Sequence, residues 1–187
     1  MSQNLKKIET ATTCAERTLR TFQGLCLAAS LLGHGGGERL AKLAFHGRIA
    51  IYSLDLLKDI YGVTPYAEGE DRRFPDLTEG KCLTLKNTSH LCGLFVNLST
   101  VGILATDVLK MLPNNRVCDI LNGVCDPLLV ICYVIDLRTG SDKGAATVTA
   151  LDLATCLAPY LGGSWAHELY TISLIASGTC GLYVALR

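Results

Sequence analysis

The feature that most constrains this chain is an uncharged run near its end, residues 169–186, which reads LYTISLIASGTCGLYVAL. As an α-helix it would be about 27 Å long at ~1.5 Å per residue, close to the thickness of the hydrocarbon core of a bilayer. Tyr170 and Tyr183 lie near its two ends, and such tyrosines suit the headgroup level of a membrane. The run therefore predicts either a membrane-crossing helix or a fully buried central helix of a soluble bundle.

Small side chains recur along one side of this run. They stand four residues apart, at Ser173, Ser177, Gly181 and Ala185, so they form a single stripe on a helix. Such a stripe lets two helix backbones approach closely, as is typical of helices that pack in lipid. We expect these four residues to form a helix–helix packing face and to support self-association of the chain.

The composition favours a single, unusually apolar domain. Of 187 residues, 49% are hydrophobic and 18% are charged, against a usual charged share of about 25%. The net charge is zero, so no basic field attracts nucleic acid, and we expect no nucleic-acid partner. The nine cysteines are odd in number and mostly lie within apolar runs, and no secretory signal opens the chain. We therefore expect reduced thiols rather than a disulfide scaffold.

An amphipathic helix is expected near the start of the chain. Thr13 and Glu16 match a capping box, which predicts a helix from Thr13 to about Leu32 after a polar, frayed start. Its apolar face comprises Ala15, Leu19, Phe22, Cys26 and Ala29. The pattern fits a helix that lies on a membrane or on a protein core.

Within this helix, we expect Leu19, Phe22 and Cys26 to insert into a phospholipid membrane. Arg17 and Arg20 lie off the apolar face. Near an anionic leaflet each arginine would add roughly 1 kcal/mol of attraction. We therefore expect these two side chains to contact lipid headgroups.

The remaining pattern predicts an all-α fold of about six helices, arranged as one membrane-associated helical bundle over residues 1–187. Residues 1–61 are expected to form amphipathic N-terminal helices, 62–88 a loop punctuated by proline and glycine, and 89–187 hydrophobic helices. No stretch alternates as a β-strand would.

Three aspartates fall within the later apolar helices, at Asp119, Asp126 and Asp152. A carboxylate at the centre of a bilayer costs at least ~2.5 kcal/mol. We therefore expect that these helices do not all cross as simple spans, and that the aspartates hydrogen-bond neighbouring helices or lie in the interface. A proton relay is the less favoured interpretation.

The sequence offers no catalytic, metal or cofactor constellation, so we expect a non-enzymatic protein with no metal and no cofactor. His34-Gly-Gly-Gly37 resembles an esterase oxyanion loop, but no GxSxG elbow accompanies it. His167-Glu168 begins like HExxH, but Thr171 stands where the second zinc ligand is needed. The chain also has no phosphate-binding glycine loop.

Two stretches resemble the peroxin-11 family of peroxisomal membrane proteins. The first, residues 15–24, places Glu16, Arg17, Arg20 and Gln23 as the family's opening helix does, although Gly24 replaces its usual aromatic. The second, residues 151–183, is similar to the family's closing pattern and contains Asp152, Leu161-Gly-Gly163, Trp165, Ser177, Gly178 and Gly181-Leu-Tyr183. The likeness is greatest to the shorter gamma-type branch.

This resemblance implies a non-enzymatic protein of the peroxisomal membrane with both termini facing the cytosol. It implies that the N-terminal helix curves and elongates the membrane ahead of peroxisome division. It also implies self-association, and possible partners in the fission machinery.

Two other classes of protein remain open. One is a bacterial secreted interaction protein of the inclusion-membrane type, for which the helices on either side of Pro113-Asn-Asn-Arg116 would form a hydrophobic hairpin. The other is a soluble helical bundle that acts as an adaptor. An enzyme is the least favoured class.

Overall fold

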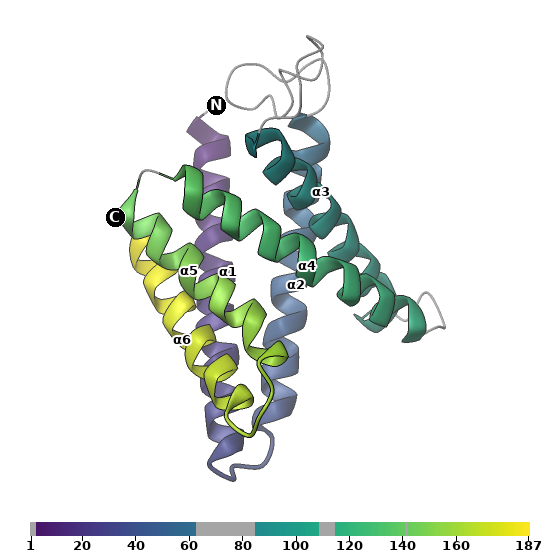
Figure 1. The fold of residues 1–187 in the computed structure, drawn as a ribbon, viewed down its shortest axis with the longest axis vertical. Helices are drawn as coiled ribbons and strands as arrows, with labels where there is room; N and C mark the ends of the chain where they lie inside the picture. The colour runs from purple at the N-terminus through teal and green to yellow at the C-terminus, as the bar shows by residue number, and fades with distance from the viewer. Residues whose placement is uncertain (1–2, 63–84, 109–114, 141) are drawn as a thin grey trace. The chain divides into compact units, whose positions relative to one another are not determined.

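The computed structural model describes residues 3–62, 85–108, 115–140 and 142–187. It confirms the all-α class, because these residues form helices and no strand occurs among them (Figure 1). The six α-helices are α1 (Gln3–Leu31), α2 (Gly37–Gly62), α3 (Leu85–Ile103), α4 (Asn115–Thr139), α5 (Lys143–Leu157) and α6 (Ala166–Ala185). A π-helical turn, Leu104–Val108, extends α3, and a 3-10 turn, Ala158–Tyr160, follows α5.

Helix α1 begins earlier than the capping box predicts. It starts at Gln3, and Thr13 lies inside it rather than at its first turn. No proline or glycine interrupts residues 3–23, so the helix continues through the polar residues expected to fray. The loop expected over residues 62–88 lies largely outside the described residues, and α3 already begins at Leu85.

The chain divides into two compact units, which differ from the boundaries expected from sequence. The middle unit is Ile49–Thr139 together with Met1–Lys6, and the terminal unit is Lys7–Arg48 together with Gly140–Arg187. Helix α2 contributes its first half to the terminal unit and its second half to the middle unit. Each unit is described separately below.

In the middle unit, α3 and α4 pack along each other. Gly102 of α3 lies against α4, because a Cβ there would meet the Leu121 side chain. Two further contacts join the helices: the Ser89 hydroxyl donates to the Asp136 carboxylate at 3.1 Å, and the Cys132 thiol donates to the Ser89 carbonyl oxygen at 3.5 Å.

By length and composition, the Asp119–Thr139 part of α4 could cross a membrane, and it is the one such helix among the described residues. Only 18% of its most apolar window is buried inside the protein. The apolar segment Leu91–Thr106 is shorter. The candidate span is therefore α4, which contains Asp119 and Asp126. The uncharged run 169–186, which the sequence left open as a crossing or a buried helix, is not a candidate span.

In the terminal unit, α6 packs against both α5 and α1. The contact with α5 extends along the helices. The approach to α1 depends on Gly178, where a Cβ would lie 2.7 Å from the Thr21 nitrogen and 2.9 Å from the Arg17 carbonyl oxygen. Leu174 and Ser177 of α6 are fully buried. The helix expected to face lipid thus buries its small-residue side within its own chain.

Two glycine corners reverse the chain in this unit. Gly33 and Gly36 have φ angles of 85° and 94° between α1 and α2, and Gly162 and Gly163 have 67° and 86° before α6. These left-handed conformations favour glycine, because a Cβ would strain them. The corners bring α2 back along α1, and α6 back along α5, so that polar residues far apart in sequence can meet.

Candidate functional site: a buried arginine–carboxylate cluster

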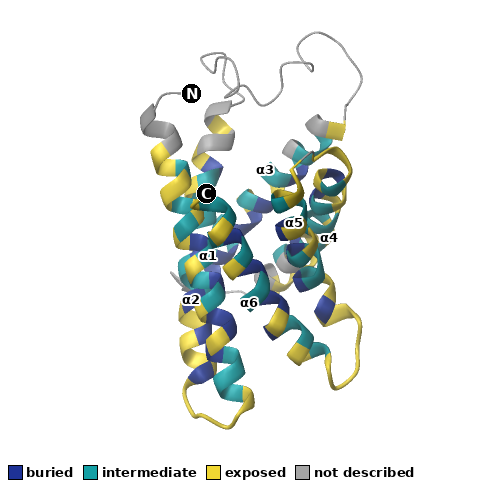
Figure 2. Cartoon of the chain, turned by 90° about the vertical axis from the view of Figure 1, so that its left-hand side faces the viewer, coloured by how far each residue is buried: buried dark blue, intermediate teal, exposed yellow. Residues whose placement is uncertain are grey.

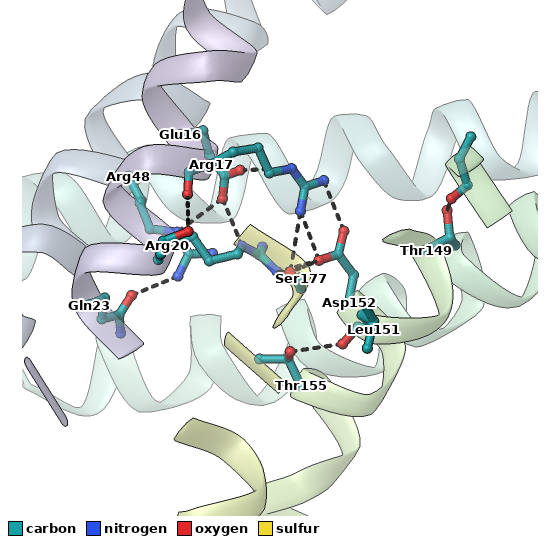
Figure 3. A network of polar contacts seen from close by, with 12 residues as sticks. Glu16, Arg17, Arg20, Gln23, Arg48, Thr149, Leu151, Asp152, Thr155 and Ser177 are labelled. Carbon is teal, nitrogen blue, oxygen red and sulfur yellow. Dashed lines mark hydrogen bonds and ion pairs between the residues drawn. The ribbon is translucent and has the colours of Figure 1, made fainter. Parts of the chain in front are cut away.

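Polar side chains from four helices of the terminal unit meet in one buried cluster (Figure 3). We call it the arginine cluster. Its members are Glu16, Arg17, Arg20 and Gln23 of α1, Arg48 of α2, Asp152 of α5 and Ser177 of α6. Residues 16, 20 and 23 of α1 are spaced by four and three, which puts them on one side of the helix.

Asp152 is the meeting point of one half of the cluster. Its side chain is 3% exposed. Arg17 donates from both terminal nitrogens, at 2.9 Å to Oδ1 and 3.0 Å to Oδ2, which is the two-pronged geometry that strengthens guanidinium–carboxylate pairs. Arg20 Nη1 and the Ser177 hydroxyl also donate to Oδ1. The carboxylate is thus satisfied by donors from α1 and α6.

Glu16 is the meeting point of the other half. Its Oε1 accepts from Arg20 Nε and from Arg48 Nε, both at 3.0 Å, and its Oε2 lies 3.3 Å from Arg17 Nε. Arg48 Nη1 also donates to the Gln23 amide oxygen at 2.7 Å. Arg20 therefore bridges the two carboxylates, and Arg48 ties α2 to the same network.

Small residues of α6 make room for the long arginine side chains. At Gly181, a Cβ would lie 2.5 Å from Arg17 Cδ and 2.6 Å from its Nε. The Ser177 hydroxyl, besides donating to Asp152, accepts from Arg20 Nη1 at 2.9 Å. Part of the small-residue stripe thus receives the polar side of α1.

The neighbouring carboxylates favour the charged form of Arg17. Burial lowers the pKa of Arg17, but the hydrogen bond and charge of Asp152 and the charge of Glu16 outweigh it, so the pKa is raised. The cluster contains three guanidinium groups and two carboxylates. Removing one partner from such a buried set leaves an uncompensated charge, which typically costs ~3–5 kcal/mol.

The headgroup contacts expected of Arg17 and Arg20 do not fit this arrangement. Arg20 is 4% exposed and pairs with Glu16 and Asp152, and Arg17 is mostly buried against Asp152. The amphipathic pattern shows only that the arginines lie off the apolar face. Since their partner Asp152 is more than 130 positions away, the pattern could not show that this side of α1 is the buried one.

The three residues expected to insert into a membrane have different environments. Cys26 is buried, which corrects the expectation for that residue. Leu19 is half-buried and packs on α2, where a Cβ at Gly47 would lie 3.0 Å from Leu19 Cδ1. Phe22 is 45% exposed, and Leu25, which the prediction did not include, is 54% exposed. Phe22 and Leu25 therefore face outward. We call these two residues the outward apolar edge of α1, and it differs from the apolar face predicted from sequence.

The small-residue stripe is largely occupied within the chain. Ser173, Ser177 and Gly181 are buried, and Ala185 is half-buried. Ser177 and Gly181 contact α1 through the arginine cluster. These residues do pack helices, but their partner is α1 of the same chain, so the stripe is not an open face for a second copy.

The sequence indicated part of this site and missed the rest. The expectation that buried aspartates bond a neighbouring helix is confirmed for Asp152, which binds Arg17 and Arg20 of α1. The role of Arg48 was not predicted, because Arg48 shares one side of its helix with Lys42 and His46, and such a basic side gives no sign of a buried partner. Two arginines and a glutamate on one side of α1 were the available signal that a buried counter-charge existed.

The arrangement joins four helices of the terminal unit through hydrogen bonds and ion pairs. The Ser177 hydroxyl donates to Asp152, and both groups also accept from Arg20. In the part of the chain that the structure describes, no group of three or more His, Cys, Asp or Glu side chains could hold a metal ion.

Comparison with known proteins finds no family model, no curated protein and no solved structure that matches this chain. The resemblance to the peroxin-11 family therefore rests on the quoted motifs. Those motifs contain Glu16, Arg17, Arg20 and Gln23 in the first stretch, and Asp152 and Ser177 in the second. These six residues meet in the arginine cluster, where they join α1 to α5 and α6.

Proposed function

We propose that this chain is a non-enzymatic protein of the peroxisomal membrane that binds, curves and elongates the membrane ahead of organelle division, with both termini facing the cytosol. The resemblance of its opening and closing motifs to the peroxin-11 family supports the organelle and the process. The distribution of polar and apolar side chains supports membrane contact.

The observation that carries the proposal is the inverted polarity of the terminal unit. Glu16, Arg20, Arg48 and Asp152 are buried, whereas several large apolar residues are exposed. Figure 2 shows how buried and exposed residues are distributed along the helices. Within the terminal unit, the exposed apolar residues on α1, α2 and the turn between them include Ile8, Phe22, Leu25, Leu31, Leu32, Leu40 and Leu43. Charges that pair inside, together with apolar residues that face outward, are the arrangement expected in lipid.

Curvature would arise from α1 acting as a rigid wedge. Phe22 and Leu25 would enter one leaflet, and burying the exposed parts of these side chains would contribute roughly 1 kcal/mol each. The arginine cluster would hold the opposite side of α1 on α5 and α6, so that the wedge cannot roll or withdraw. The candidate span in α4 would anchor the chain.

A vesicle assay with the full-length chain tests the wedge. The variant Phe22→Ser with Leu25→Ser removes the outward apolar edge, and we expect it to lose vesicle tubulation while keeping its helical circular dichroism, because both residues are exposed. The matched control, Phe22→Leu with Leu25→Phe, conserves apolar area and should tubulate like the parent. Equal tubulation by the serine variant and the parent would refute the wedge.

A second candidate is the bacterial inclusion-membrane type of interaction protein. It is favoured by one observation, the packing of the apolar helix α3 on the candidate span α4. Localisation of the tagged full-length chain in cells separates the two functions: peroxisomes support the first proposal. A soluble adaptor would leave membranes on carbonate washing.

A further inference from the structure

A groove of about 610 Å³ lies in the terminal unit, beside the arginine cluster but separate from the outward edge of α1. Its walls come from the end of α1, the start of α2 and the corner that leads into α6. This volume falls within the range of ~300–1,000 Å³ that small-molecule sites occupy. The apolar wall residues include Leu27, Ala41, Phe45 and Pro159.

The polar groups of the groove are unevenly placed. Gln23 and Tyr170 line it next to the arginine cluster, and the two side chains are close enough to hydrogen-bond each other. Gln23 is buried, and its amide oxygen accepts from Arg48, which leaves the amide nitrogen as the donor end. Glu38, Lys42 and His167 also line the groove, and the opposite charges of Glu38 and Lys42 offset each other.

The charge near Gln23 and Tyr170 favours an anion. Burial raises the pKa of the Tyr170 hydroxyl. The positive charges of Arg48 and Arg20 partly offset this rise, so both guanidinium groups are close enough to influence the hydroxyl. The hydroxyl stays protonated at neutral pH and can donate. The two neutral donors, Gln23 and Tyr170, suit one carboxylate, and Arg20 and Arg48, which pair with Glu16 and Asp152, lie beside them.

From these features we propose that the groove binds one long-chain fatty acid, with its carboxylate at Gln23 and Tyr170 and its chain along Leu27, Ala41 and Phe45. The carboxylate accepts hydrogen bonds and has none to donate, which matches the donors offered. The acyl chain lies against these apolar residues in an open groove. This inference goes beyond the proposed function and does not depend on it.

The chain carries its own reporter for this site. Trp165 is its only tryptophan. Its Nε1 lies 3.0 Å from the position that a Cβ would take at Gly163, a residue that lines the groove. A brominated acyl chain in the groove should therefore quench tryptophan fluorescence by contact.

The experiment titrates full-length protein, in a neutral non-fluorescent detergent, with dibromostearic acid and, separately, with its methyl ester. We expect saturable quenching by the acid with a Kd at least tenfold lower than that of the ester, because only the acid has the anionic head. The variant Tyr170→Phe removes one donor and should raise the Kd of the acid about tenfold. Linear quenching that is equal for acid and ester would indicate mere partition into detergent and would overturn the proposal.

A pair of alanine substitutions separates groove binding from contact elsewhere. Ala166→Phe adds a ring to the groove lining, whereas Ala150→Phe adds the same ring to an exposed position on α5. The first should weaken saturable quenching at least tenfold and the second should not, with circular dichroism confirming that both variants are helical. Equal affinities in the two folded variants would also overturn the proposal, whereas failure of the vesicle assay above would leave it intact.

Discussion

Replacing Asp152 by asparagine should destabilise the terminal unit strongly. The carboxylate is 3% exposed and receives Arg17 in a two-pronged contact at 2.9 and 3.0 Å, as well as Arg20. Asparagine keeps the shape but removes the charge, so two guanidinium groups lose a counter-charge. Breaking a buried ion pair costs ~3–5 kcal/mol. Because Arg17 retains some solvent contact, we expect the lower end, about 3 kcal/mol.

The matched control is Asp142→Asn, which makes the same substitution at the exposed N-cap of α5. Asp142 accepts a hydrogen bond from the Gly144 backbone amide at 2.9 Å, and asparagine caps helices about as well as aspartate. We expect a loss below about 0.5 kcal/mol. The assay is urea unfolding of the full-length chain in detergent, followed by circular dichroism at 222 nm. Equal losses in the two variants would refute the buried, charged role of Asp152.

A double-mutant cycle tests whether Arg20 is a partner of Asp152. Arg20→Gln and Asp152→Asn should be coupled, because each removes one side of the same buried contact. We expect the double variant to be more stable than the sum of the single losses predicts, by roughly 1–3 kcal/mol. Additive losses would show that Arg20 and Asp152 do not interact in the folded protein.

Three further predictions use the same packing. Gly178→Ala should destabilise the chain by about 1–3 kcal/mol, because its Cβ would meet the backbone of α1, whereas Gly93→Ala, with open space around it, should be neutral or stabilising. Arg48→Lys should also be destabilising, since one ammonium cannot bind Glu16 and Gln23 as a guanidinium does; stability equal to the parent would contradict this. Burial raises the pKa of the Cys26 thiol, so a short maleimide pulse at pH 7, followed by mass spectrometry, should leave this residue unlabelled.

The fold class could be predicted because apolar residues recur every three or four positions and no strand-like alternation competes with them. Helix ends were harder to place: the capping pair Thr13 and Glu16 also fits the interior of a helix, and Glu16 is in fact used as a buried ion partner. Local pattern cannot distinguish these two uses of a glutamate.

The burial of the polar side of α1 could not be predicted, for a different physical reason. A helical pattern divides α1 into an apolar side and a polar side, and burial of the apolar side is the usual outcome. Here Arg20 meets Asp152 from 132 positions away and is buried with it, while Phe22 stays partly exposed. Which side of α1 is buried depends on the pairing of charges between distant helices. Sequence periodicity carries no information about that pairing.

The most direct test of the inverted polarity is the behaviour of the purified full-length chain toward lipid. In a flotation assay with phospholipid vesicles, we expect the protein to float with the vesicles and to remain with them after washing in carbonate at pH 11, because its contact is apolar rather than ionic. A chain that stays monodisperse in detergent-free buffer and remains at the bottom of the gradient would contradict the account.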